Sequence, residues 1–161
     1  MTDFSADTAI PSEQTVSQDA YGERIRMIFG ASIVQVIRCA ALFSLADHAE
    51  RGRITAEEFS AAEGLDPDAA GRVLRACTGF GLFSMSDDAG YAGTALLRTL
   101  RSNTSHSLRD LALIQGGPGH WVPWGRLDDA LRTGRAQTEA TLGQSLRDYY
   151  ARRSGAPAGG I

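Results

Sequence analysis

One apolar stretch, residues 25–45, constrains the fold of this chain more than any other feature of its sequence. Its apolar side chains recur at helical spacing, and apolar neighbours widen the stripe beyond one face of a helix. The spaced residues are Ile25, Ile28, Phe29, Val36, Ile37, Ala40 and Ala41, and the neighbours are Met27, Ile33 and Val34. A helix of this kind serves two surfaces, so we expect it to pack against its own core and against a partner.

The composition is that of a single globular domain. The chain has 161 residues, of which 43% are hydrophobic and 22% are charged, and its formal net charge is −3. Domains of this size and composition fold without disulfides. Cys39 and Cys77 stand in apolar surroundings and form no C-x-x-C motif, which indicates free thiols in a reducing, intracellular compartment. The mild acidity argues against non-specific binding to nucleic acid or to anionic membranes.

No targeting or membrane-spanning segment is expected. Residues 1–20 contain no basic residue, whereas a secretory signal begins with a basic region. The longest uncharged apolar run, residues 27–37, has only about half the length needed to cross a bilayer. We therefore predict a cytoplasmic protein with no membrane partner.

The middle of the chain has the order helix, turn, helix and hairpin, which is typical of a winged helix. The motif Thr55-Ala-Glu-Glu58 is a capping box and predicts a short helix after it. Asp66-Pro67 predicts the start of a second helix, with aspartate as the N-cap and proline in the first turn. Two short runs, residues 82–85 and 91–93, flank an acidic turn at 87–90 and predict a small β-hairpin.

Further helices are expected toward the C-terminus, so the predicted fold class is mainly α with a winged-helix-like motif and a small β-hairpin. These helices cover residues 94–99, 107–115, 121–131 and 146–153, with a glycine-interrupted connection at 133–145. The polar segment 1–18 and the low-complexity segment 154–161 are predicted to be a flexible and a frayed tail on one domain, residues 19–153.

Several linked motifs follow one another in a characteristic order. They are CAALFSLADHAERG, the capping box TAEEF, the segment DPDAAGRVLRACTGFGLF, the stretch TALLRTLRSN after the hairpin, and the tryptophan-containing HWVPWGRLDDALRTGR. Together they resemble the N-terminal dimerisation domain of S-adenosylmethionine-dependent O-methyltransferases, which modify plant phenolics and bacterial polyketides and antibiotics. The resemblance extends over residues 27–143.

This resemblance implies a dimer. In the family, the first long helix intertwines with its counterpart across a large two-fold interface. The interface residues would be Ile25, Ile28, Phe29, Ile33, Val36 and Ile37. The partner would be a second copy of this chain, or a related full-length or catalytic chain. A charged residue at position 33 or 36 is then expected to dissociate the dimer, because it would bury an unpaired charge.

The resemblance also implies what the chain lacks. In the family a Rossmann-like domain binds S-adenosylmethionine through a D-x-G-x-G-x-G loop, and a later histidine is the usual general base. The sequence contains no such loop, and Gly116-Gly-Pro-Gly119 follows an expected helix rather than a strand. We therefore expect no cofactor site in this chain, which would carry the dimerising half of a methyltransferase without the methylating half.

The remaining candidates for chemistry or DNA binding are weak. His48, His106 and His120 lack the spacing of a metal site, which needs three or four ligands, so no metal is expected. His48 is interpreted as a cation at a helix end. Arg72 and Arg75 on the second predicted helix are the side chains available for DNA, but acidic residues at the start of that helix and in the wing would repel phosphates.

Trp121 and Trp124 leave three interpretations open. In the first, both side chains pack in the core. Alternatively, with Met27 and Phe29 they contact an aromatic or polyketide-like small molecule, because the resembled family places this region near the acceptor pocket. In the third interpretation the same face docks a protein partner. No catalytic residue is identified under any of them.

Two functions therefore remain. In the first, the chain is a non-catalytic dimerising and substrate-capping subunit in natural-product biosynthesis. In the second, it is a cofactor-independent enzyme or a ligand-binding protein that guides a cyclisation or rearrangement through positioning alone. A winged-helix transcriptional regulator and a gene fragment without an independent role are the lesser alternatives.

Overall fold

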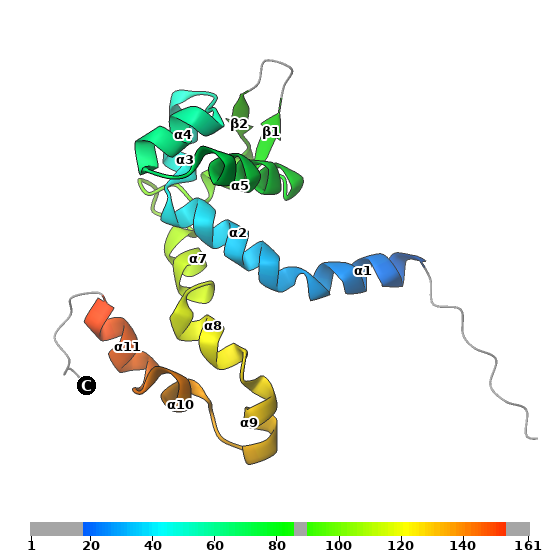
Figure 1. Cartoon of the computed structure of the whole chain (residues 1–161), viewed down its shortest axis with the longest axis vertical. Helices are drawn as coiled ribbons and strands as arrows, with labels where there is room; N and C mark the ends of the chain where they lie inside the picture. The colour runs from blue at the N-terminus through cyan, green and yellow to red at the C-terminus, as the bar shows by residue number, and fades with distance from the viewer. Residues whose placement is uncertain (1–17, 86–89, 154–161) are drawn as a thin grey trace, which may run out of the picture. The chain divides into compact units, whose positions relative to one another are not determined.

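A computed structural model describes residues 18–85 and 90–153. The chain divides into two units, residues 1–30 and 31–161, and each is taken by itself. The predicted tails, apart from Gln18 at the start of the first helix, and residues 86–89 of the predicted wing turn lie outside the described residues. The described residues are mainly helical and contain a two-stranded antiparallel hairpin, which confirms the predicted fold class (Figure 1).

The apolar stretch is divided among several helices. Helix α1 (Gln18–Ile28) is followed by Phe29, whose amide donates to the Ile25 carbonyl at 3.0 Å, and α2 (Gly30–Leu42) begins at the next residue. A glycine inside a helix costs about 1 kcal/mol relative to alanine, so Gly30 is a favoured place for this break. Among the described residues no single helix is long and apolar enough to cross a bilayer. Helices α1 and α2 have the necessary length and apolar content only when they are counted together across the bend between them.

A tight turn joins α2 to the residues that follow. Ser44 lies in the left-handed region with φ of 49°, and its carbonyl accepts from the amides of Asp47 and His48 at 2.9 and 3.0 Å. These bonds start α3 (Leu45–His48), and the 3-10 helix η1 (Ala49–Arg51) comes next. The turn places Leu45 in the core.

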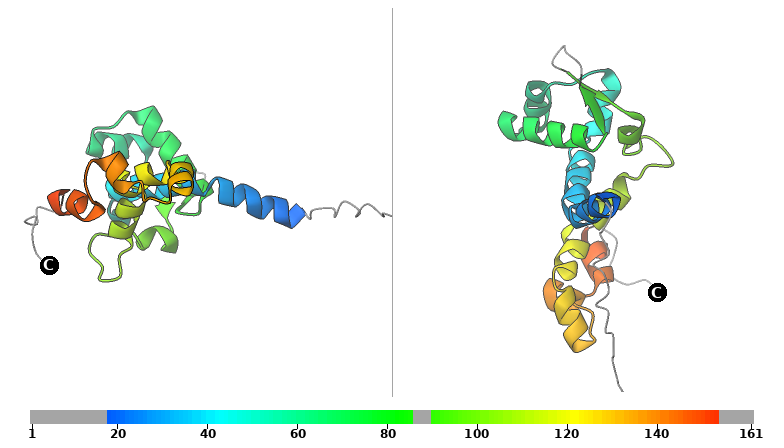
Figure 2. Two further views of the ribbon diagram at one scale, coloured as in Figure 1. Left: turned by 90° about the horizontal axis from the view of Figure 1, so that it is seen from below. Right: turned by 90° about the vertical axis from the view of Figure 1, so that its right-hand side faces the viewer.

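The predicted winged-helix order is present in α4 (Ala56–Glu63), α5 (Pro67–Gly79), β1 (Phe83–Met85) and β2 (Tyr91–Gly93). The capping box forms as predicted, because the Glu58 amide donates to the Thr55 hydroxyl at 3.1 Å and the Thr55 amide donates to the Glu58 carboxylate at 2.9 Å. Asp66 caps α5 by accepting from the Ala69 amide at 2.8 Å. Helix α5 packs against α4 and β1 (Figure 2).

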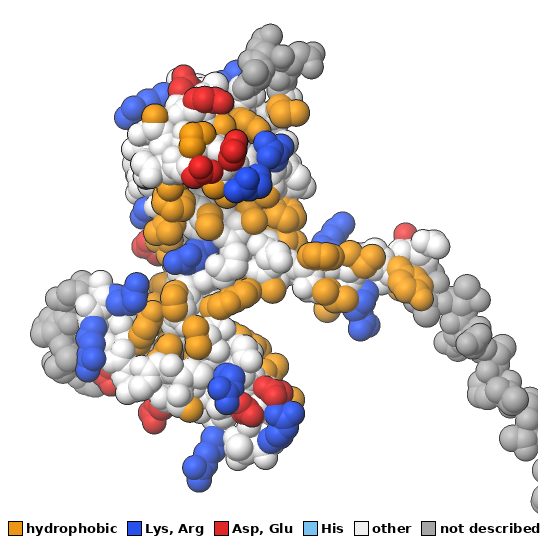
Figure 3. All heavy atoms as spheres, in the orientation of Figure 1, with side chains coloured by type: hydrophobic (Ala, Val, Ile, Leu, Met, Phe, Trp, Pro, Cys, Tyr) orange, Lys and Arg blue, Asp and Glu red, His pale blue; other side chains and the backbone are white. Residues whose placement is uncertain are grey.

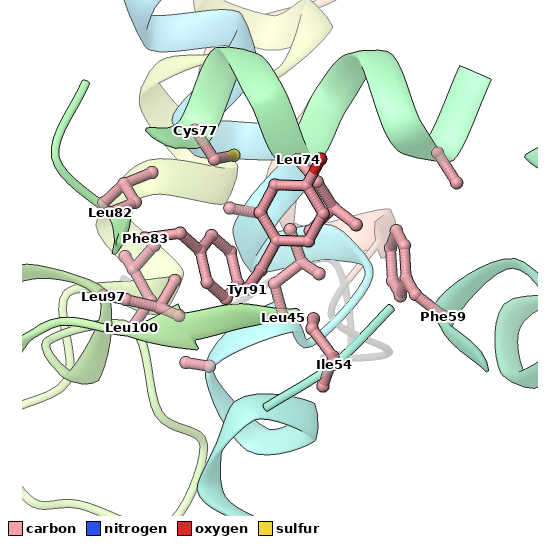
Figure 4. Packing of buried hydrophobic residues seen from close by; sticks show 13 residues of the cluster. Leu45, Ile54, Phe59, Leu74, Cys77, Leu82, Phe83, Tyr91, Leu97 and Leu100 are labelled. Atoms are coloured by element: carbon pink, nitrogen blue, oxygen red, sulfur yellow. The ribbon is translucent and has the colours of Figure 1, made fainter. Parts of the chain in front are cut away.

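The buried core of the described residues is supplied by positions 40–100. Leu45, Leu74, Leu97 and Cys77 are its largest fully buried side chains, and Figure 4 shows them where α5 and the hairpin pack together. Phe83 and Tyr91 meet edge to face across the hairpin with ring centroids 6.1 Å apart. Aromatic pairs of this geometry add to the stabilisation that burial provides.

The C-terminal part is more broken than predicted. Its helices are α6 (Ala95–Arg98), α7 (Arg109–Gln115), α8 (Pro118–Trp124), α9 (Leu127–Thr133), α10 (Thr138–Leu142) and α11 (Leu146–Arg153). The single helix expected over residues 121–131 is therefore wrong, because α8 ends at Trp124 and α9 begins at Leu127. Pro123 has no amide to continue the hydrogen-bond ladder, and the Arg126 amide instead donates to the Pro123 carbonyl at 3.0 Å. The expected connection at 133–145 contains α10.

Side-chain hydrogen bonds hold the C-terminal helices on α2. The Arg109 guanidinium at the start of α7 donates from Nε to the Ala41 carbonyl at 3.1 Å. The Gln35 amide on α2 donates to the Gly116 carbonyl at 2.9 Å, just after α7 ends. Helix α8 in turn packs against α7, α10 and α11.

Candidate functional site

Helix α1 carries an apolar stripe that its own unit does not cover. Tyr21, Ile25 and Ile28 recur at intervals of four and three residues and so lie on one face of the helix. Ile25 is 54% exposed, Ile28 is 67% exposed, and no residue of α1 is buried. Figure 3 shows hydrophobic side chains at the surface of this helix. A helix that buries no apolar residue within its own unit leaves its apolar face available to another surface.

The predicted interface residues on α2 differ from those on α1. Ile33 is half-buried. Val36 and Ile37 are half-buried as well and pack against the core cluster of their own unit. A charge at position 36 would therefore disturb the protomer as well as any interface, and positions on α1 are cleaner places to probe association.

The two tryptophans are not core residues. Trp121 is 41% exposed and Trp124 is 66% exposed, so the interpretation that both pack the core of this chain is wrong. Helices α8 and α9 expose further apolar side chains beside them, namely Val122, Leu127 and Leu131. Met27 and Phe29, which were grouped with the tryptophans as ligand-binding residues, are exposed in the first unit. That grouping stays a prediction.

A hollow of about 480 Å³ lies between α2, α7, α8 and α11. Its lining combines aromatic, aliphatic and charged side chains with backbone: Arg38, Leu42, Asp110, Leu113, Ile114, Gly117, Pro118, Gly119, Tyr149, Tyr150 and Arg153. None of the four predicted ligand-binding residues is among them. The spacing of residues in the sequence does not predict this site, although the glycine-rich segment and the Tyr149-Tyr150 pair are visible in it.

The glycines of Gly116-Gly-Pro-Gly119 allow close packing between helices. A Cβ atom on Gly116 would lie 2.8 Å from side-chain atoms of Arg38 on α2. A Cβ atom on Gly119 would lie 2.7 Å from the Tyr150 hydroxyl and 2.8 Å from a ring atom of Tyr149. Both glycines are buried. The segment therefore serves as a packing site for α2 and α11, which accounts for its glycines without a cofactor.

Two tyrosines of α11 form one wall of the hollow. The Tyr150 hydroxyl donates to the Ile114 carbonyl at 3.2 Å and lies 2.8 Å from Nδ1 of His120. Burial raises the pKa of Tyr150, neighbouring Tyr149 raises it further, and Arg153 opposes the rise. The Tyr149 and Tyr150 rings meet edge to face at 5.2 Å, and the Arg153 guanidinium lies 5.2 Å from the centroid of the Tyr149 ring.

The charged side chains of the hollow are not neutralised by one another. Within residues 18–85 and 90–153, Arg38, Asp110 and Arg153 form no ion pair, which leaves the lining with one excess positive charge. The Nε atom of Arg38 is buried and has no acceptor within hydrogen-bonding distance. A buried donor without an acceptor costs about 1–3 kcal/mol, and a guanidinium can only donate.

The structure also shows the surroundings of the histidine and the arginines that were considered for metal or DNA binding. His48 lies 2.6 Å from Glu63 through Nε2 and meets the Phe59 ring edge to face, so its partner is a carboxylate on α4. Arg72 and Arg75 lie exposed on α5. In the part of the chain that the structure describes, no three His, Cys, Asp or Glu side chains gather as metal ligands would.

Comparison with known proteins identifies the family of the domain that spans the middle of the chain. Residues 25–103 match the O-methyltransferase dimerisation domain. The 3-amino-4-hydroxybenzoate 4-O-methyltransferase of Streptomyces cremeus is 38% identical over 138 residues, which are 84% of this chain and 38% of that enzyme. The phenazine O-methyltransferase PhzM of Lysobacter antibioticus is 28% identical over 128 residues, or 80% of this chain and 37% of that enzyme.

The fold agrees with these sequence matches. The crystal structure of LaPhzM superposes with a TM-score of 0.77 at 27% identity, and the match covers 84% of this chain and 40% of that one. The chain therefore spans well under half the length of the relatives it matches.

Proposed function

The chain carries an O-methyltransferase dimerisation domain, and we propose that this domain is the dimerising and substrate-capping part of a methyltransferase that modifies small aromatic natural products. A dimerisation domain implies dimer formation. The identity of the partner and the non-catalytic role are our proposals, and a second copy of this chain is the partner we favour.

The observation that carries the proposal is the uncovered apolar face of α1. Tyr21, Ile25 and Ile28 form a stripe on a helix that buries nothing within its own unit. Burying such a stripe against a second copy gains roughly 25 cal/mol for each Å² of apolar surface removed from water. Because a two-fold interface uses the same patch twice, one stripe supplies both sides of the contact.

The substrates in the names of two relatives support an aromatic substrate class. The Streptomyces cremeus relative acts on 3-amino-4-hydroxybenzoate and the Lysobacter antibioticus relative on a phenazine, and both of these compounds are aromatic. Exposed tryptophans suit such substrates, because their rings stack on flat ligands. We propose that Trp121 and Trp124 contribute to the cap in the assembled enzyme, and that Trp124→Ala weakens binding of the aromatic acceptor there without changing the dimer mass.

Light scattering over a wide concentration range tests dimerisation. We expect the mass of a dimer for the wild-type chain and the mass of a monomer for Ile25→Arg, because the new charge would be buried without a counter-ion. Glu23→Arg introduces the same side chain at another exposed position of α1 and should remain dimeric. A wild-type monomer at every concentration would contradict self-association and direct attention to a separate catalytic chain, and a dimeric Ile25→Arg variant would exclude this face of α1.

A second candidate function, a small-molecule-binding protein, is favoured by a different observation. The hollow between α2, α7, α8 and α11 has a volume of about 480 Å³, which lies within the range of roughly 300–1,000 Å³ that is usual for small-molecule sites. Ligand binding there is compatible with dimerisation, so the two functions can belong to one protein.

A further inference from the structure

The hollow has the lining of a site for a flat, partly apolar molecule. Leu42 on α2 and Leu113 and Ile114 on α7 contribute aliphatic surface, and Tyr149 and Tyr150 on α11 contribute aromatic surface. The backbone of the glycine-rich segment forms part of the lining between these helices. Sites with this lining bind ligands through apolar contact and orient them through a few polar groups.

The polar groups of the hollow select for negative charge. Arg38 and Arg153 share the lining with a single carboxylate, Asp110, and none of the three is engaged in an ion pair among the described residues. The Nε–H of Arg38 is buried inside the protein, so a ligand in the hollow would meet the other N–H groups of this guanidinium. The stem of Arg38 packs against Gly116, and this contact restricts where its guanidinium can go. A positioned guanidinium matches the oxygens of a carboxylate.

We propose that this hollow binds an aromatic carboxylate, with the carboxylate on Arg38 and the ring against the tyrosine wall. The site contains none of Met27, Phe29, Trp121 and Trp124, so it is distinct from the predicted aromatic cap. The inference rests on the proposed function only for the choice of an aromatic ligand. The charge requirement comes from Arg38 and Arg153, which outnumber the carboxylate of Asp110 in the lining.

Isothermal titration of the full chain with a matched pair of probes tests the proposal. The probes are 3-amino-4-hydroxybenzoate and its primary amide, which differ only in the charged group. We expect the carboxylate to bind at least about tenfold more tightly than the amide, because a hydrogen bond to a charged group contributes roughly 1.4 kcal/mol or more, the equivalent of that factor. Equal binding of the two probes, or no binding of either, would overturn the proposal.

Four variants locate the binding. Arg38→Gln should weaken carboxylate binding by about tenfold or more and bring it to the level of the amide. Arg135→Gln, which removes an exposed arginine outside the hollow, should leave binding within about twofold of wild type. Leu42→Trp fills the hollow without changing a charge and should weaken both probes. Trp124→Ala removes a ring of the proposed cap and so distinguishes binding at the cap from binding in the hollow. A loss of binding in Trp124→Ala with full binding in Arg38→Gln would move the ligand to the predicted cap and overturn this assignment.

The same samples separate this inference from the proposed function. Circular dichroism shows whether each variant folds. If Arg38→Gln does not fold, Leu42→Trp provides the test of the hollow instead. Light scattering on the titrated protein gives its mass. A dimer that binds neither probe would overturn the carboxylate site alone, whereas a monomer that binds the carboxylate through Arg38 would leave the site standing and contradict self-association.

Discussion

Gly119 lies beneath two aromatic side chains and has no room for a Cβ atom. Such an atom would be 2.7 Å from the Tyr150 hydroxyl and 2.8 Å from a Tyr149 ring atom. Gly119→Ala must push α11 away from α8 or rotate both rings, and overpacking of this kind costs about 1–3 kcal/mol. We expect that loss in the free energy of unfolding measured with urea.

Gly79→Ala is the matched control for this prediction. Gly79 ends α5, and a Cβ atom there would meet nothing within 4 Å. Alanine should be neutral at this position or stabilising by up to about 1 kcal/mol, because it reduces the freedom of the unfolded chain. Equal effects of the two substitutions would show that α8 and α11 do not pack as closely as the structure has them.

Cys77 makes stability depend on pH in the alkaline range. Burial, and to a smaller extent neighbouring Cys39, raises the pKa of the Cys77 thiol from 9.0 to about 12. A thiol with a raised folded-state pKa contributes stability that is complete below pH 9 and is lost as the pH rises toward 12, because the unfolded chain ionises first. Urea unfolding of wild type and Cys77→Ala should show a steeper decline of stability over this range in wild type. Parallel declines in the two proteins would contradict the assignment.

The chemical types of single residues could be predicted from the sequence, but their exposure could not. Trp121 and Trp124 have the same apolar character whether they face their own core, a ligand or a partner. The structure leaves them exposed because the core of the described residues is already filled by positions 40–100. Which surface covers a side chain depends on contacts that are remote in the sequence.

At the scale of single elements, α4 depends on its N-terminal cap. The Thr55 hydroxyl and the Glu58 carboxylate each accept a backbone amide at the first turn. Thr55→Ala should lower the free energy of unfolding by about 0.5–2 kcal/mol, since it leaves the Glu58 amide without its acceptor. Glu57→Ala changes an exposed residue in the same turn that is not part of the capping box, and it should cost only a few tenths of a kcal/mol. A Glu57→Ala effect as large as that of Thr55→Ala would contradict the role of the cap.

The elements whose formation depends on residues close together in the sequence were predicted best. The capping box, the Asp66 cap and the hairpin all form where the sequence predicts, because each depends on residues three to ten positions apart. The ends of α1 and α8 were missed. Helix α1 is separated from α2 at Phe29, just before a glycine, which a helix can tolerate. Helix α8 contains Pro123 and ends one residue after it. In neither place does the spacing of apolar residues indicate that the helix ends.

For the whole molecule, the hollow could not have been found from sequence spacing. It brings together residues from positions 38 to 153 on four helices, and only the packing of α7 and α8 on α2 places them side by side. The proposed dimer face differs in this respect. Its residues lie close together in the sequence on α1, so their apolar spacing could be recognised from the sequence alone.

Dimer formation should make thermal stability depend on concentration. If two copies bury the α1 stripe only when folded, mass action stabilises the folded dimer as the protein concentration rises. A hundredfold increase in concentration should raise the Tm of the wild-type chain and of Glu23→Arg by several degrees, as expected for a domain of this size.

Ile25→Arg removes the dimer without entering the core, since Ile25 is exposed within its own unit. Its Tm should therefore be the same at both concentrations and should lie near the wild-type value extrapolated to dilute protein. Calorimetric scans at the two concentrations measure this directly. A wild-type Tm that does not change with concentration, in a sample whose mass at low temperature is that of a dimer, would mean that the interface opens before the protomers unfold and that α1 contributes little to the stability of the fold.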